Sequence, residues 1–190
     1  MLKRVGIVVV ALGALLAVAV VGLFLASRRR DAGVNDVTIE IARPPAQVFR
    51  WLAEGDLARR WVGGLTEITS LEAGPARLGL KGRAAVVLGA ERMTLETEVV
   101  DFEPDRRIRY QVTGLDRPAS GFTEVVDFAV EPAETGTRLR IFGRMRYHRR
   151  LLRLFEPLMT RRAQRKFEED AQRLKALVEA EPAEAAAPPP

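Results

Sequence analysis

The sequence contains no cysteine and a single histidine, His148. A domain without cysteine cannot form a disulfide, so its stability has to come from a packed core. The same shortage excludes a zinc site built from histidine and cysteine ligands. We therefore expect neither a metal nor a cofactor. His148 follows a predicted strand among arginines, where we expect it to be solvated or to cap an element.

Several motifs that mark enzymes are also missing. The sequence has no glycine-rich phosphate loop, no zinc-protease helix motif and no Gly-x-Ser-x-Gly nucleophile elbow. Lysine is scarce, so arginine carries most of the net charge of +5. A basic chain favours nucleic acid or anionic lipid as a partner. No aromatic ladder accompanies the charge, so we expect lipid headgroups and no nucleic acid.

The longest apolar run covers residues 5–26 and contains no charged residue. As a helix it is about 33 Å long, close to the roughly 30 Å thickness of a hydrocarbon core. Basic residues flank both ends of the run. They are Lys3 and Arg4 before it, and Arg28, Arg29 and Arg30 after it. The pattern predicts one transmembrane anchor over residues 1–30, with the three arginines in contact with the membrane.

A cleaved signal peptide is the alternative interpretation of this segment. The run is longer than the usual signal core of about 7–15 residues, and Phe24 and Leu25 are bulky where cleavage requires small residues. Both features favour the anchor. Positive charge stays in the cytoplasm, and the three arginines that follow the run favour a cytoplasmic soluble domain.

The rest of the chain is divided into a linker at residues 31–35, one domain at 36–181 and an Ala/Pro tail at 182–190. Val37, Ile39 and Ile41 alternate with polar residues, which predicts a half-buried strand. Pro45 suits the first turn of a following helix, and a second short helix ends before Gly63. The apolar period then becomes two. We expect strands at 65–71, 76–88, 92–102, 106–113, 120–130 and 137–147.

After residue 147 the apolar period becomes 3.6, which predicts a long amphipathic helix that ends near residue 181. Pro157 interrupts the stripe, so we expect a short helix, a break and then the long helix. The last strand places apolar residues on one face and arginines on the other, as in an antiparallel sheet with one packed face. The order of elements predicts an α+β domain whose curved sheet buries the stripe of the helix.

This order resembles the SRPBCC superfamily, also called the START or Bet v-type helix-grip fold. The resemblance covers roughly residues 34–181. Its signals are the strand that runs into segment 41–52 (IARPPAQVFRWL), Trp61, the hairpin at 135–139 (TGTRL) and the closing segment 173–179 (RLKALVE). Within the superfamily the chain is most similar to the polyketide cyclase/dehydrase and lipid-transport branch.

The resemblance implies an antiparallel sheet of about seven strands wrapped around the long C-terminal helix, with an apolar cavity between them. Members bind lipids, sterols, quinones or polyketides, and some are enzymes. We expect a membrane-tethered module that binds or transfers a hydrophobic ligand such as a lipid, a quinone or a polyketide-like molecule. The alternatives are a cyclase or dehydratase that uses a glutamate and a tyrosine in the cavity, and an interaction domain whose cavity is filled by its own side chains.

The candidate ligand-binding residues are those expected to point from the sheet, the short helices or the long helix into that cavity. They are Trp61, Leu95, Thr97, Tyr110, Phe122, Glu124, Met145, Phe155 and Met159. A few placed polar groups orient a ligand in an apolar pocket. A buried Glu124 has a raised pKa and is the weak candidate for a catalytic acid; alternatively it reaches water or pairs with an arginine. Tyr110 either presents its hydroxyl to a ligand or packs, and Trp61 either gates the cavity or belongs to the core.

A basic block surrounds the start of the long helix. Arg149, Arg150 and Arg153 are predicted to contact the membrane, and Arg161, Arg162, Arg165 and Lys166 continue the block. Each basic group near an anionic bilayer contributes about 1 kcal/mol. The alternative is a solvated helix face whose cations pair with Glu168, Glu169 and Asp170. For ligand entry we expect the shell to open at Gly63-Gly64 and at 114–121.

Overall fold

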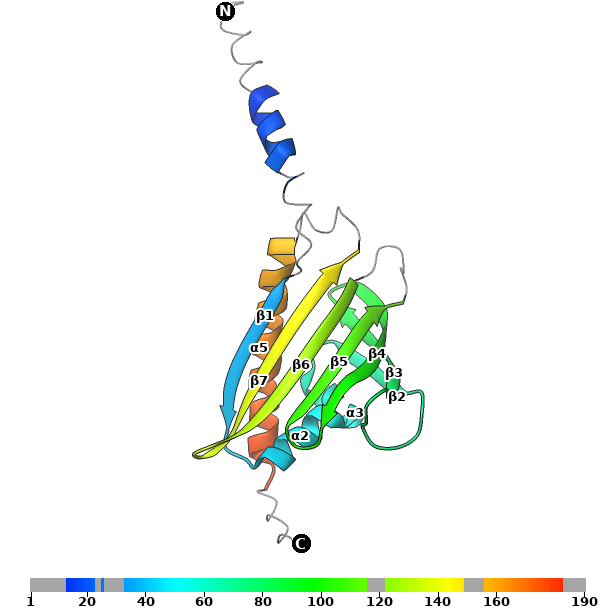
Figure 1. Cartoon of the computed structure of the whole chain (residues 1–190), viewed down its shortest axis with the longest axis vertical. Coiled ribbons are helices and arrows are strands. Elements are labelled where there is room, and N and C mark those ends of the chain that lie inside the picture. Colours follow the sequence, from blue (N-terminus) through cyan, green and yellow to red (C-terminus); the bar gives the residue numbers. More distant parts are fainter. Residues whose placement is uncertain (1–12, 23–24, 26–32, 116–121, 149–155, 183–190) are drawn as a thin grey trace, which may run out of the picture.

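The computed structural model describes residues 13–22, 25, 33–115, 122–148 and 156–182. Ten elements form the domain, and Figure 1 shows their arrangement. In chain order they are β1 Val34–Ile41, α2 Pro45–Ala53, α3 Gly55–Trp61, β2 Leu65–Ser70, β3 Lys81–Leu88, β4 Glu91–Glu103, β5 Arg107–Gly114, β6 Phe122–Ala133, β7 Gly136–Tyr147 and α5 Glu156–Ala180.

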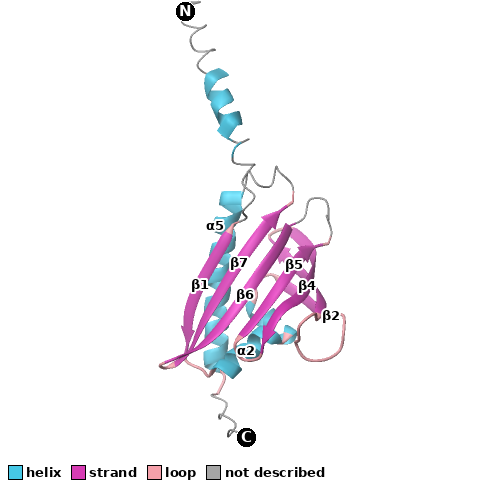
Figure 2. Ribbon diagram, viewed as in Figure 1, coloured by secondary structure: helices cyan, strands magenta, loops and turns pink. Residues whose placement is uncertain are grey.

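The seven strands form one antiparallel sheet in the order β1-β7-β6-β5-β4-β3-β2. Figure 2 shows α5 along one face of this sheet, with α2 at the end of the domain where α5 ends. We call the face that α5 packs against the inner face, and the opposite one the outer face. The predicted α+β helix-grip architecture, with a seven-stranded sheet and a long C-terminal helix, is confirmed.

Most strands begin and end within three residues of their predicted limits, but one begins later. The strand expected at 76–88 begins only at Lys81, because Gly74 and Gly79 have positive φ angles of 118° and 79° and turn the chain before it. Pro157 lies within α5, whose described part begins at Glu156. The short helix and the break that are expected before the long helix fall on residues 149–155, which lie outside those described, so they remain predictions.

The driest part of the core lies where α2, α3 and the C-terminal half of α5 meet the inner face. Its largest fully buried side chains include Trp51, Ile108, Leu139 and Leu174. Pro45 starts α2 at its first helical position, and the helix then buries Val48, Phe49, Trp51 and Leu52 against the sheet. This end of the domain is therefore a closed core that holds the sheet and the helices in a fixed arrangement.

The C-terminal end of α5 is joined to α2 by Glu181. Its Oε2 accepts hydrogen bonds from Arg50 Nη2 at 2.9 Å, from Trp51 Nε1 at 3.0 Å and from Gln47 Nε2 at 3.5 Å. Partial burial acts to raise the pKa of Glu181, but the bonds from Trp51 and Gln47 and the charge of Arg50 hold it below its ordinary value. The ionised carboxylate therefore stabilises the fold.

We expect Glu181→Gln to lower the free energy of unfolding by about 0.5–1 kcal/mol at pH 7, since the carboxylate is partly open to water. The contribution of a carboxylate with a lowered pKa is present at neutral pH and is lost as the pH falls through that pKa. Urea unfolding at pH 7 and pH 3 tests this, and the two proteins should converge at pH 3. A difference of equal size at both pH values would contradict a charge-dependent role.

The apolar N-terminal segment is described only in part. Residues 13–22 are helical and expose apolar side chains, with Leu15 at 75% and Leu16 at 68% exposure. Among the residues that the structure describes, no helix is both long enough and apolar enough to cross a membrane. Residues 1–12, 23–24 and 26–30 of the predicted anchor lie outside those described, and so do Arg149, Arg150 and Arg153. The anchor and its arginines therefore remain predictions.

Candidate functional site

One row of side chains crosses the inner face and contains three of the predicted ligand-binding residues. The strand register places Met145 of β7 opposite Glu124 of β6, Glu124 opposite Val112 of β5, and Val112 opposite Thr97 of β4. Residues directly opposite in paired antiparallel strands share a face. We call these four residues the Glu124 row. It stops at Gly82 of β3, where a Cβ would lie 2.9 Å from Thr97 Oγ1.

The Glu124 row is less enclosed than the core at the other end of the same strands. All four of its side chains are half-buried, and so is Phe122. By contrast, the inward-facing Ile108, Val130 and Leu139 are at most 3% exposed. The N-terminal half of α5 covers this region with Phe167, which lies over Gly143, and with Lys166, whose charge acts on Glu124. It also carries the half-buried Met159. The inner face therefore has a closed end and a second, partly accessible end.

Glu124 combines burial with an unused hydrogen-bonding atom. Its Oε1 is enclosed, and none of the described residues donates a hydrogen bond to it. A Cβ at Gly143 would lie 3.4 Å from this oxygen and 2.7 Å from Phe167 Cζ. The glycine thus lets both Glu124 and the Phe167 ring lie close to the sheet. An enclosed polar atom without a hydrogen-bond partner lowers the stability of a fold by about 1–3 kcal/mol, which a ligand that donates to this oxygen would offset.

Burial raises the pKa of Glu124 to about 7, while the positive charge of Lys166 acts to lower it. Tyr147 faces the same region from β7, and its pKa is raised to about 12 by burial and by the negative charges of Glu124 and Glu156. Near neutral pH the carboxyl of Glu124 therefore exists in both forms. The protonated form donates a hydrogen bond, and the ionised form only accepts them.

Lys166→Met is expected to raise the pKa of Glu124 further above about 7, because it removes a nearby positive charge that lowers it. The measurement is a carbon-13 NMR titration of the Glu124 carboxyl, assigned by its disappearance in Glu124→Gln. Arg165→Met, on the exposed side of α5, is the matched control and should leave the titration in place. An unchanged or lower pKa in Lys166→Met would contradict the electrostatic contact.

Tyr110 and Trp61 take part in packing. The Tyr110 hydroxyl donates a hydrogen bond to the Leu52 carbonyl at 3.0 Å, and burial raises its pKa. Trp61 is 5% exposed, and its Nε1 donates to the Trp51 carbonyl at 3.0 Å. Both rings meet Phe128 edge-on, at centroid distances of 6.2 Å and 6.0 Å. The Tyr110 hydroxyl thus joins β5 to α2, and the Trp61 indole joins α3 to α2. These bonds do not direct either group at the Glu124 row.

The remaining predicted residues lie around the row or beyond the description. Leu95 is buried with Ala84 and Val86, and Phe122 packs against this second cluster. Met159 lies half-buried in the first turns of α5, and Phe155 is outside the described residues. The structure adds Lys166, Phe167, Tyr147 and Gly143. The sequence pattern placed Phe167 and Tyr147 in the core and Lys166 in a basic block, and a glycine on the packed face of β7 was the one signal of a close approach there.

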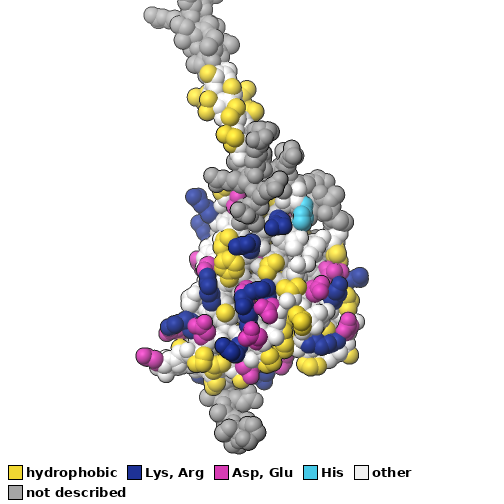
Figure 3. Space-filling model, in the orientation of Figure 1, with side chains coloured by type: hydrophobic (Ala, Val, Ile, Leu, Met, Phe, Trp, Pro, Cys, Tyr) yellow, Lys and Arg dark blue, Asp and Glu magenta, His cyan; other side chains and the backbone are white. Residues whose placement is uncertain are grey.

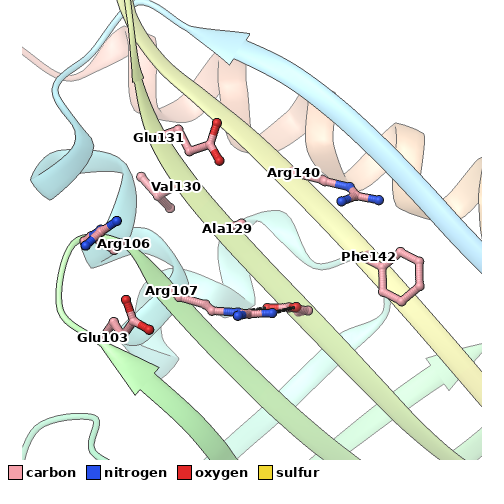
Figure 4. A pocket seen from close by; sticks show the side chains of 9 residues that line it. Glu103, Arg106, Arg107, Ala129, Val130, Glu131, Arg140 and Phe142 are labelled. Atoms are coloured by element: carbon pink, nitrogen blue, oxygen red, sulfur yellow. Dashed lines mark hydrogen bonds and ion pairs between the residues drawn. The ribbon is translucent and has the colours of Figure 1, made fainter.

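The recess in Figure 4 lies on the outer face, away from the predicted cavity. It has a volume of about 540 Å³, and its lining includes Arg107, Asp127, Arg140 and Phe142. Asp127 accepts hydrogen bonds from Arg107 and, at 3.0 Å, from Arg109. Partial burial acts to raise the pKa of Asp127, but these bonds hold it below its ordinary value. The recess is therefore a charged surface on which Arg107 pairs with Asp127 and Arg140 pairs with Asp36.

Charges of both signs are intermixed on the outer face, as Figure 3 shows. On α5, Lys166 and Arg173 both pair with Asp170, which accounts for part of the basic block as the solvated-face alternative describes. No group of three or more histidine, cysteine or acidic side chains is placed to hold a metal in the part of the chain that the structure describes.

The fold is shared with solved structures at low sequence identity. A crystal structure from Chromobacterium violaceum is 18% identical, with a TM-score of 0.62, and the match covers 78% of this chain and 99% of that one. Ara h 8.0201 is 11% identical, with a TM-score of 0.59 and coverages of 78% and 98%. DynU16, from the dynemicin biosynthetic locus, is 17% identical, with a TM-score of 0.57 and coverages of 78% and 48%. At these identities the likeness establishes the fold alone.

No curated protein sequence matches the chain. The family profile described as polyketide cyclase / dehydrase and lipid transport matches residues 35–179, which include every element from β1 to most of α5. This range also contains the whole Glu124 row and the residues of α5 that cover it. Because the match spans most of the chain, the protein belongs to the polyketide cyclase / dehydrase and lipid transport family of the SRPBCC superfamily.

Proposed function

We propose that this domain binds a hydrophobic ligand between the Glu124 row and the N-terminal half of α5. The observation that carries the proposal is the enclosed Oε1 of Glu124, to which no described residue donates a hydrogen bond, among half-buried apolar side chains. A largely apolar site with one placed polar group holds and orients a small molecule. Membership of a family described by cyclase, dehydrase and lipid-transport activities supports the same class of ligand.

The N-terminal segment is proposed to tether this module to a membrane, with the domain on the cytoplasmic side. Support comes from the uncharged run at residues 5–26, its basic flanks and the exposed apolar side chains at residues 13–22. A tether holds the binding site at high effective concentration near its lipophilic ligand. Protease protection of the domain in oriented vesicles tests this arrangement: cleavage from the extracytoplasmic side would reverse it.

Mass spectrometry of what co-purifies with the full chain tests the binding function. We expect a stoichiometric lipid, quinone or polyketide-like molecule after organic extraction. Val112→Trp fills the proposed site from the Glu124 row and should abolish the bound molecule. Gln111→Trp makes the same change on the outer face of the same strand, where Gln111 is exposed, and should keep it. Retention in both variants would move the ligand elsewhere, and an empty protein that takes up no lipid mixture would refute binding.

A cyclase or dehydratase is the second candidate function, because the pKa of Glu124 near 7 suits a general acid or base at neutral pH. Glu124→Gln would then keep the ligand and lose turnover of it. If a substrate of the bound class is converted equally by the wild type and by Glu124→Gln, this role for Glu124 is refuted.

A further inference from the structure

We infer that the site selects amphipathic ligands whose polar end is a neutral hydroxyl, held by Glu124, and rejects the same chain when it ends in a carboxylate. The inference rests on the proposed function, because it assigns the ligand class of the same site. It follows from three observations: the Oε1 of Glu124 is enclosed, its surroundings are apolar, and the nearby cation Lys166 is already paired.

The enclosed Oε1 of Glu124 accepts no hydrogen bond from the described residues. An ionised carboxylate has only acceptor atoms, so a ligand completes it by offering a donor. A hydroxyl group supplies that donor. A ligand carboxylate supplies a second set of acceptors and a second negative charge, and two like charges in one apolar site repel each other.

The surroundings of Glu124 set the rest of the ligand. Val112 and Met145 flank it in the row, and the Phe167 ring covers the adjacent Gly143. These neighbours offer apolar contact only. Thr97, next to Val112 in the row, and Tyr147 of β7 provide further polar groups on this part of the sheet. A ligand with an apolar chain and one small polar end matches this distribution.

Lys166 is the cation that faces Glu124, and it does not make the site a receptor for anions. Its Nζ is hydrogen-bonded to Asp170 Oδ2, one turn further along α5. Asp170 is also within 3.4 Å of Arg173 Nη1. The charge of Lys166 is therefore balanced within the helix. Among the described residues, the other titratable groups that act here are Tyr147 of β7 and, through Tyr147, Glu156 of α5. Glu156 adds negative charge, which disfavours an anion further.

Three probes of matched size differ only in their polar end. They are 1-dodecanol, which has a hydroxyl donor, 1-methoxyundecane, an ether that lacks the donor, and dodecanoate, which carries a negative charge. Each competes with a neutral fluorescent naphthylamine probe for the full chain in lipid nanodiscs, and protein-free nanodiscs correct for partition. At pH 9 we expect the alcohol to bind about tenfold more tightly than the ether or the carboxylate, as one hydrogen bond to a charged group provides. At pH 5 the protonated Glu124 donates to the ether, so the alcohol and the ether should bind alike.

Glu124→Gln replaces the carboxylate by an amide that both donates and accepts, so it should bind the alcohol and the ether alike at both pH values. Glu131→Gln makes the same change on the outer face of β6 and should keep the preference. Equal binding of the three probes by the wild type, tighter binding of dodecanoate, or a preference that survives in Glu124→Gln would each overturn the inference while leaving hydrophobic binding intact. Failure of all three probes to compete would instead refute the proposed function.

Discussion

Glu124→Gln is expected to be more stable than the wild type at pH 9 and equally stable at pH 4. Burial raises the pKa of Glu124 from an ordinary 4.5 to about 7. A carboxyl whose pKa is raised by folding stabilises the fold while it is protonated, and this contribution is lost as the pH rises through the folded value. The difference between these two pKa values corresponds to a loss of at most about 3 kcal/mol in the free energy of unfolding. The glutamine variant never ionises, so it escapes this loss.

Urea unfolding of the full chain from pH 4 to pH 9 measures the effect. The wild type should lose stability mainly between pH 4.5 and pH 7, and Glu124→Gln should show a flatter profile in this window. Glu131→Gln, an exposed position on the same strand, controls for the loss of one acidic group and should follow the wild type. A wild-type profile that is flat, or one whose slope is unchanged in Glu124→Gln, would show that this carboxyl does not titrate with folding.

A ligand would account for the presence of a carboxyl that destabilises the fold at alkaline pH. An enclosed carboxyl costs stability when it ionises, and leucine or methionine in its place would avoid that cost. A ligand that donates to Oε1 stabilises the ionised form and returns part of the lost stability. The wild type should therefore recover stability at pH 9 when 1-dodecanol is added, whereas Glu124→Gln should gain little. Such a difference would link the stability of the fold to the occupancy of the site.

The architecture could be predicted because its strands and its long helix each give a periodic pattern of apolar residues in the sequence. The alternation of apolar residues in β1 and β7 set both the strands and their inner faces, and the stripe of α5 had no other surface to bury against. The inward direction of Glu124 followed from the same parity.

The contacts of individual polar groups did not follow from the sequence. Tyr110 and Trp61 face inward as the pattern requires, yet their polar atoms meet the carbonyls of Leu52 and Trp51 in α2. The pattern of one strand carries no information about where a helix from another part of the chain ends. The alternative in which the basic block pairs along α5 is met at Lys166, which bonds to Asp170. Its proximity to Glu124 did not follow, because it depends on which side of α5 meets the sheet.

Asp170→Ala is expected to lower the free energy of unfolding by about 3 kcal/mol, the usual cost of leaving buried or charged partners of a carboxylate unpaired. Asp170 is 6% exposed. Its Oδ1 accepts the backbone N–H of Gly63 at 2.8 Å, and Lys166 bonds to the other oxygen. The carboxylate thus fastens the loop after α3 to the middle of α5. This contact opposes the predicted opening of the shell at Gly63-Gly64.

Asp170→Asn keeps an oxygen for Gly63 but loses the charge, so it should cost about half as much in the same urea unfolding experiment. Glu169→Ala removes an exposed carboxylate from the adjacent position and should change stability by less than about 0.5 kcal/mol. Amide hydrogen exchange at Gly63 should accelerate in Asp170→Ala, remain slow in Glu169→Ala and lie between them in Asp170→Asn. Slow exchange in all three variants would show that contacts other than Asp170 hold the loop. Opening of the shell at Gly63-Gly64 would then not depend on this contact with α5.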